Sequence, residues 1–244
     1  MEILITNDDG WGTPGIRLLA QEMSRLGHVT VVAPDSPRSG FGACITATEA
    51  IYLTKVESDI ENTDVYISTG TPVDCVKLSV DVFYQGKLPD LLVSGINHGN
   101  NCSVNVLYSG TMGACIAGCE HGIPSIGFSI DDHSMEVDLQ YFRPWIEKIT
   151  RRLLDRGFAP RVCYNVNAPV GEIDDARMAR SSHGRWIKEM RPHTDEAGKD
   201  CYLLGGEFHN DEPDAKDTDW WMLKHRMIAI QPVTIDVTHY ASLR

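Results

Sequence analysis

The chain has 244 residues, of which 42% are hydrophobic and 23% are charged, and its formal net charge is -12. This composition is typical of a globular protein with a well-buried core, and it excludes a fibrous or disordered chain. The acidic balance argues against an extended nucleic acid as a partner, because the two polyanions would repel each other. A small phosphorylated ligand is compatible with the charge if a bound divalent cation reverses the local field.

The alternation of two kinds of segment along the chain predicts the fold class. Short, nearly apolar runs predict strands at 2–7, 28–34, 63–68, 90–94, 123–130 and 227–234. Apolar residues at helical spacing predict helices at 15–26, 71–84, 109–120 and 138–156. Strands that are apolar throughout and alternate with helices indicate an α/β fold, a doubly wound and mostly parallel sheet that is covered on both faces.

The sequence changes character near residue 170, where polar, charged and aromatic residues replace the regular pattern. We therefore expect a core of residues 1–170 and a C-terminal extension of residues 171–244 within one unit. The extension is too hydrophilic to own a core, so we expect it to lean on the main domain or on a second subunit. Trp220 and Trp221 are more typical of packing or interface positions than of a base-stacking platform, although nucleotide stacking on this region stays open.

The cysteines and the first residues bear on the compartment. Seven cysteines are an odd number, and most lie in apolar stretches, so we expect no disulfide framework. Cys115 and Cys119 lie in a small-residue setting that favours packing over metal binding. The chain begins directly with strand-like sequence, and no apolar stretch reaches the roughly 18 residues of a membrane span. We expect a cytoplasmic protein without a membrane partner.

Three loops that follow predicted strands carry short oxygen-bearing side chains and glycines, at 7–10, 34–40 and 95–101. Ligands of open α/β sheets bind beyond the carboxyl ends of the strands. Adjacent carboxylates at such an edge repel each other, and a hard cation such as Mg²⁺ or Mn²⁺ offsets that repulsion. We expect Asp8 and Asp9 to be ligands, with Ser39 and Asn97 as neutral oxygen donors. The alternative for each loop is a local turn or cap.

A fourth element is the start of the predicted helix at 109–120. Its amino end offers unpaired N–H groups and two hydroxyls at Ser109, Gly110 and Thr111, and we expect it to hold the substrate phosphate. The alternative is a simple N-cap followed by small residues for close packing. Arg38 either steers the phosphate or forms a surface ion pair, and both readings stay open.

Two histidines near these loops could act as general acids or bases. His98 lies in the Gly/Asn loop, and His121 precedes Gly122 at the end of a predicted helix. A structural role is sufficient for each, and for His121 this is a C-cap.

Taken together, the motifs of this sequence resemble those of the SurE (survival protein) family of 5′/3′-nucleotidases. The resemblance is carried, in order, by NDDGWGTPGI at 7–16, VVAPDSPRSG at 31–40, TGTPVDCVKL at 69–78, LLVSGINHGNN at 91–101, YSGTMGA at 108–114 and NVNAP at 165–169. Beyond about residue 170 the match is loose, around 185–186 and 230–233.

The resemblance implies a Rossmann-like fold that hydrolyses the phosphomonoester of nucleoside 5′- and 3′-monophosphates. It implies one divalent ion per subunit, held by Asp8, Asp9, Ser39 and Asn97. Asp8, Asp9 and Asn97 would be the catalytic residues, and Ser39, Gly40 and Asn97 would also contact the phosphate. Members of this family form dimers, sometimes tetramers, through an exchanged C-terminal segment, so a homodimer or homotetramer is expected.

Three departures from the family pattern bear on substrate preference and turnover. Ala43 stands where a polar residue is usual, Cys102 and Ser103 replace an apolar-glycine pair, and Asn105 stands where an aspartate is typical. The last change removes a carboxylate near the expected metal.

The predicted mechanism is an in-line attack on phosphorus by a water that the ion activates, with the 109–111 segment on the nonbridging oxygens. A nucleotide-sensing module with weak or no catalysis is the main alternative. An aspartyl-phosphate phosphatase is disfavoured because its chemistry generally needs an Asp-x-Asp spacing. A receiver-like module is disfavoured because no phosphoacceptor aspartate follows the third strand.

Overall fold

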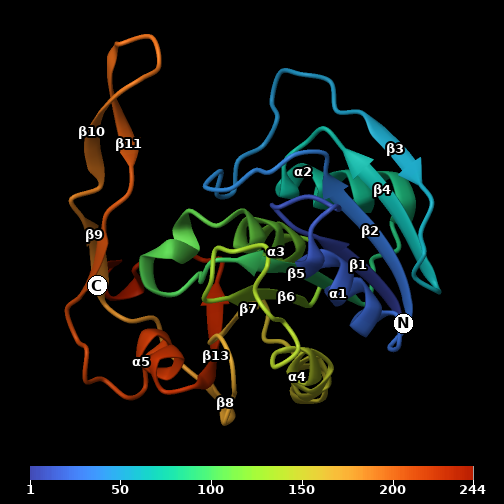
Figure 1. The fold of residues 1–244 in the computed structure, drawn as a ribbon. Helices are drawn as coiled ribbons and strands as arrows, with labels where there is room; N and C mark the ends of the chain where they lie inside the picture. Colours follow the sequence, from blue (N-terminus) through green and yellow to red (C-terminus); the bar gives the residue numbers. More distant parts are fainter. Residues whose placement is uncertain (244) are drawn as a thin grey trace.

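A nine-stranded sheet forms the centre of the computed structural model, which describes residues 1–243 (Figure 1). The strands lie in the order β3 (Leu53–Val56), β4 (Thr63–Ser68), β2 (His28–Pro34), β1 (Glu2–Thr6), β5 (Leu91–His98), β6 (Ser125–Ile130), β7 (Val162–Ala168), β13 (Met227–Thr234) and β8 (Asp175–Met178). All pairs from β4 to β7 are parallel. The pairs β3–β4 and β13–β7 are antiparallel. The predicted α/β fold with a mostly parallel sheet is confirmed.

Helices cover both faces of the sheet. Helices α1 (Pro14–Met23) and α4 (Arg143–Arg156) contact each other on one face, and α2 (Pro72–Leu78) and α3 (Gly110–Glu120) contact each other on the opposite face (Figure 1). Strand β1 serves both layers, because Ile3 and Ile5 join one apolar core while Leu4 joins the other. This alternation is the side-chain period of a strand buried on both sides.

All four predicted helices are present, and only α4 starts several residues later than predicted. Helix α2 begins after Thr71, whose side chain forms a capping box with Asp74, and continues as a π-helix η1 (Ser79–Tyr84). Helix α3 is capped by Ser109 and ends at His121, as predicted. Helix α4 starts at Arg143 rather than at residue 138, because the Asp138 carboxylate accepts a hydrogen bond from the Gln140 N–H at 2.9 Å and holds a turn there.

Strand β5 is longer than predicted, and the expected loop at 95–101 is wrong for its first part. After a bulge, Asn97 and His98 still pair with β6. Gly95 permits this because its φ is +125° and an added Cβ would lie 2.2 Å from the Phe128 carbonyl oxygen. Asn97 and His98 therefore lie on a strand and not in the predicted loop.

The C-terminal extension contributes to the main sheet and also projects from it. Strand β13 lies between β7 and β8, and α5 (Asp219–Lys224) packs on β13. A small cluster of Ala179, Met222, Met227 and Ala229 is buried there. Strand β9 (Gly184–Ile187) pairs with β12 (Glu207–Asn210), and β10 (Met190–Thr194) pairs with β11 (Asp200–Leu204) in a projecting hairpin (Figure 1).

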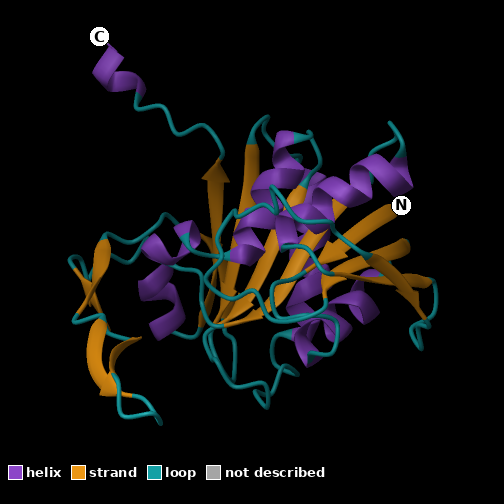
Figure 2. Ribbon diagram, turned by 90° about the horizontal axis from the view of Figure 1, so that it is seen from above, coloured by secondary structure: helices purple, strands orange, loops and turns teal. Residues whose placement is uncertain are grey.

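The last element is a 3-10 helix η3 (Tyr240–Leu243), which stands away from the body at the end of an extended segment (Figure 2). A further 3-10 helix, η2 (Ser103–Leu107), precedes α3. Within the described residues, no helix combines the length and the apolar character that a membrane crossing requires.

Candidate active site

The topology brings the predicted loops together. From β1 the chain builds the sheet toward β2 and β4, then returns to the other side of β1 with β5. This reversal is the switch point at which open α/β sheets bind ligands. The Arg38 N–H donates to the Asp8 carbonyl oxygen at 2.7 Å, and the Gly42 N–H donates to the Tyr108 carbonyl oxygen at 3.0 Å. The loops after β1 and β2 and the start of α3 are thus joined by backbone hydrogen bonds.

A cavity of about 360 Å³ opens at this edge. Five predicted site residues line it: Asp8, Ser39, Gly40, Asn97 and Ser109. Asp9, Gly110 and Thr111 are not part of the lining, although Asp9 directly follows Asp8 in the chain and Gly110 and Thr111 follow Ser109. The rest of the lining consists of Gly99, Asn100, Asn101, Tyr108, His133, Trp186 and Leu204, for which no role was predicted, together with His98 and Asn105.

Asp8 is buried, with only 3% of its surface exposed. Burial, and secondly the neighbouring Asp9 charge, raise the pKa of its carboxyl to about 6, although hydrogen bonds from Thr111 lower the pKa. The Thr111 hydroxyl donates to Asp8 Oδ1 at 2.6 Å. Gly110 leaves the necessary space, since an added Cβ there would lie 2.8 Å from Asp8 Cβ. The amino end of α3 therefore holds the Asp8 carboxylate.

Asp9 is also buried, at 6% exposure, and His98 holds it in place. The backbone N–H of His98 donates to Asp9 Oδ2 at 3.3 Å, and Nδ1 of the same residue lies 3.2 Å from that oxygen. Oδ1 of Asp9 is left for another partner. The structural role expected for His98 is therefore to orient Asp9, a candidate metal ligand.

Asn97 and Ser39 supply neutral oxygens. The Asn97 Nδ2 group donates to the Gly99 carbonyl oxygen at 2.6 Å, so Oδ1 of this cavity-lining side chain remains available as a metal ligand. Ser39 is exposed on the cavity wall.

This donor set fits a hard divalent cation. Two carboxylates, a hydroxyl and an amide oxygen are the ligand types that Mg²⁺ and Mn²⁺ prefer. Within residues 1–243, no three His, Cys, Asp or Glu side chains are grouped so that they could hold a metal. A site built on Asp8 and Asp9 therefore depends on neutral oxygens such as those of Ser39 and Asn97.

The start of α3 differs in part from the prediction. The Ser109 side chain accepts a hydrogen bond from the Met112 N–H at 3.1 Å, which is the simple N-cap alternative. Ser109 still borders the cavity. Thr111 is fully buried and its hydroxyl faces Asp8, so this geometry does not support a direct contact between that hydroxyl and a phosphate.

Arg38, Trp220 and Trp221 each contact side chains or backbone groups of the protein itself. Arg38 pairs with Asp35 at 3.1 Å and donates to the Thr69 carbonyl oxygen at 2.9 Å, which is the ion-pair alternative. Trp220 packs on Phe208, with ring centroids 4.5 Å apart. Trp221 stacks on His225, with ring centroids 3.7 Å apart.

A buried amide network supports the cavity floor from β7. Asn167 Oδ1 accepts a hydrogen bond from the Asn101 N–H at 2.7 Å, and Asn165 Nδ2 donates to the Asn101 carbonyl oxygen at 2.8 Å. The sequence of the 165–169 motif indicates such a network, because asparagines inside an otherwise apolar strand need polar partners.

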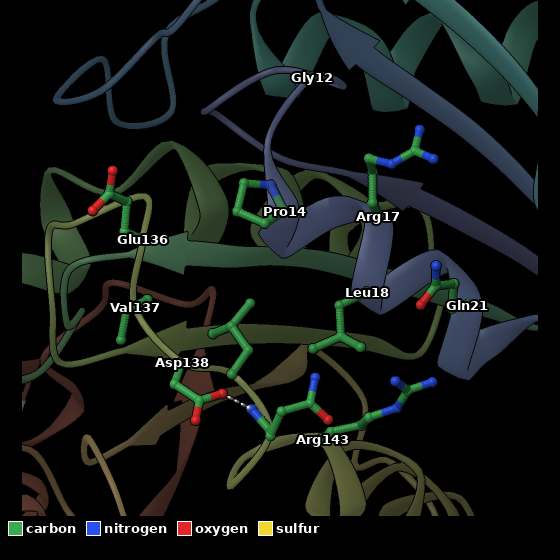
Figure 3. A pocket seen from close by; sticks show the side chains of 11 residues that line it. Gly12, Pro14, Arg17, Leu18, Gln21, Glu136, Val137, Asp138 and Arg143 are labelled. Atoms are coloured by element: carbon green, nitrogen blue, oxygen red, sulfur yellow. Dashed lines mark hydrogen bonds between the residues drawn. The ribbon is translucent and has the colours of Figure 1, made fainter.

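A second cavity, of about 670 Å³, lies between α1 and residues 136–143 (Figure 3). Both of its arginines already have acidic partners: Arg17 donates to Asp59, and Arg143 donates to Glu22. It contains none of the predicted site residues. The cavity at the switch point is therefore the candidate site.

Fold and site together define a Rossmann-like α/β protein whose acidic ligand pocket lies at the carboxyl edge of a parallel sheet. Comparison with known proteins identifies the family. The sequence model described as Survival protein SurE matches residues 3–188, so the chain belongs to the SurE family.

The relatives agree over nearly the whole chain. A 5′-nucleotidase SurE from Phocaeicola vulgatus is 42% identical over 242 residues, which cover 99% of this chain and 93% of the relative. A 5′-nucleotidase SurE from Flavobacterium psychrophilum is 43% identical over 243 residues, covering 98% and 94%. The crystal structure of the Sure protein from Aquifex aeolicus has a TM-score of 0.85 at 31% identity, covering 100% of this chain and 97% of that one.

Proposed function

We propose that this protein is a phosphoric monoester hydrolase that converts nucleoside 5′- and 3′-monophosphates to nucleoside and phosphate with one divalent ion, Mg²⁺ or Mn²⁺, per subunit. The relatives named 5′-nucleotidase support the reaction class. The observation that carries the metal dependence is the buried pair Asp8 and Asp9. Among the described residues, neither carboxylate forms a salt bridge with a lysine or arginine, so a cation is the simplest partner for both.

The proposed ligands are Asp8, Asp9, Ser39 and Asn97. When bound, a divalent ion would supply Lewis acidity to a phosphoryl oxygen and to a water. Asp8 and Asp9 are held by α3 and His98, so they can position that water without rearranging. Asp8, Asp9 and Asn97 are the proposed catalytic residues.

The proposed phosphate contacts are Ser39, Gly40, Asn97, Ser109 and the backbone N–H groups of Gly110 and Thr111. The first four line the cavity, and Ser109, Gly110 and Thr111 lie at the positive end of the α3 dipole. Donors in this place can follow the charge of the nonbridging oxygens as water attacks phosphorus in line.

Phosphate release from 5′-AMP and 3′-AMP, measured with and without Mn²⁺, tests the function. We expect release only with the metal, and we expect the Asp9→Asn variant to lose at least about a hundredfold in kcat. The exposed Asp214→Asn variant is the matched control and should behave as the wild type. Tight AMP binding without phosphate release would favour the nucleotide-sensing alternative, and near-normal turnover of Asp9→Asn would refute the site assignment.

We also propose a homodimer or homotetramer formed through the C-terminal extension. Its projecting parts expose large apolar side chains: Met190 is 64% exposed, Tyr202 70%, Leu204 74% and Val237 98%. Apolar groups in this number on projecting segments are typical of interaction surfaces. Light scattering of the full chain should give a multiple of the chain mass, and deletion of 235–244 should lower it; a monomeric full chain would contradict this.

A further inference from the structure

Trp186 lies on the wall of the candidate cavity although it belongs to the C-terminal extension. It is half-buried on β9 and shares the cavity with Asp8, Ser39 and Asn97. Trp186 takes no part in the proposed hydrolysis step. A large aromatic side chain at the edge of a polar pocket can contact a flat, apolar part of a ligand.

The indole is held in a fixed position. Its Nε1–H donates to Asn105 Oδ1 at 2.7 Å. The Asn105 amide is itself oriented, because its Nδ2 group donates to the Asn100 carbonyl oxygen at 3.2 Å. Phe208 meets the indole edge-on, with ring centroids 5.9 Å apart at 72°, and Trp220 packs behind Phe208. Rotation of the indole would break these contacts together, so the ring is pre-organised.

The side chains that line the cavity are of two chemical kinds. Carboxylate, hydroxyl and amide groups form the first kind, and the side chains of Tyr108, Trp186 and Leu204 form the second. Tyr108 and Leu204 are exposed by 58% and 74%. The volume of about 360 Å³ lies in the range for small-molecule sites, about 300–1,000 Å³. A nucleoside monophosphate has the same division, with an anionic phosphate at one end and a flat base at the other.

We propose that Trp186 is a specificity-determining residue whose indole face stacks on the nucleobase of the substrate while the phosphate lies at the acidic end of the cavity. This inference rests on the proposed nucleotidase function. It also gives the Asn105 departure a role, because an amide satisfies the Asn100 carbonyl oxygen and the indole N–H at once, whereas a carboxylate could not donate to Asn100.

The test compares two substrates that share sugar and phosphate but differ in the base: 5′-AMP and ribose 5-phosphate, both with Mn²⁺. The Trp186→Leu variant keeps an apolar contact with Phe208 and removes the aromatic face. The Trp186→Phe variant keeps an aromatic face. Trp220→Leu is the matched control, because Trp220 packs on the same Phe208 but lies outside the cavity lining.

We expect Trp186→Leu to lower the ratio of kcat/KM for AMP to that for ribose 5-phosphate about tenfold, through KM for AMP, which corresponds to about 1.4 kcal/mol. Trp186→Phe and Trp220→Leu should keep the ratio within about twofold of the wild type. An unchanged ratio in Trp186→Leu, or an equal fall in Trp220→Leu, would overturn the proposal. If the wild-type protein releases phosphate from neither substrate, the proposed nucleotidase function is overturned as well. This result differs from an unchanged substrate ratio, which would overturn only the role of Trp186.

Discussion

The Asp8 carboxylate makes the metal-free protein less stable, and this cost can be measured. Its pKa rises from 3.8 to about 6, chiefly through burial and secondly through Asp9. A tenfold change in proton affinity corresponds to about 1.4 kcal/mol, so ionised Asp8 costs about 3 kcal/mol of unfolding free energy at about pH 7.5. The Asp8→Asn variant removes this cost, and its side-chain oxygen can still accept the Thr111 hydroxyl hydrogen bond.

The sign of the pH dependence follows from the raised pKa. Protonation of Asp8 stabilises the fold fully below pH 3.8, and this contribution is lost as pH rises through about 6. The advantage of Asp8→Asn over the wild type is therefore about 3 kcal/mol at about pH 7.5 and shrinks to about 1 kcal/mol at about pH 4.5.

Urea unfolding in EDTA at the two pH values measures this difference. The exposed Asp214→Asn control should stay within about 0.5 kcal/mol of the wild type. Added Mn²⁺ should stabilise the wild type and leave Asp8→Asn unchanged. If Asp8→Asn were no more stable than the wild type in EDTA at about pH 7.5, the reasoning about burial of this charge would be wrong.

Two other substitutions probe how Asp8 and Asp9 are held. Gly110→Ala places a Cβ 2.8 Å from Asp8 Cβ and should abolish Mn²⁺ binding by calorimetry, whereas Gly12→Ala, with open space around it, should bind as the wild type does. His98→Ala removes the side-chain contact to Asp9 and should weaken Mn²⁺ binding about 10–100-fold. Unchanged affinity in either variant would contradict the assigned support role.

Much of the fold could be predicted from the sequence because the parallel strands are buried on both sides. An apolar run such as 28–34 has one stable environment, the middle of a covered sheet. The cap at Ser109 and the stop at His121 were readable because their signals are local. The extension of β5 through Asn97 was not, because its pairing with β6 resumes after a bulge that the local sequence does not reveal.

The candidate site was predictable where topology decides it. Parallel strands that meet at a switch point bring the residues at their carboxyl ends together, regardless of the conformation of each loop. Asp8, Ser39 and Asn97 could therefore be placed at one edge of the sheet. Contacts across long sequence separations could not be placed in this way. The Thr111 hydroxyl bond to Asp8 spans 103 residues, and the Trp186 indole bond to Asn105 spans 81, and no periodicity encodes either.

The C-terminal extension also depends on long-range contacts that the sequence does not reveal. Its strand at 227–234 was predicted from apolar content, but its place between β7 and β8 was not, because register and neighbour depend on the assembled sheet. Whether it exchanges between subunits stays a prediction.

Anomalous diffraction from crystals grown with Mn²⁺ measures the proposed metal site most directly. One peak per chain is predicted, within coordination distance of the carboxylates of Asp8 and Asp9, the Ser39 hydroxyl and Asn97 Oδ1. Absence of a peak among these four side chains, at a manganese concentration that supports phosphate release, would contradict the proposed catalytic centre.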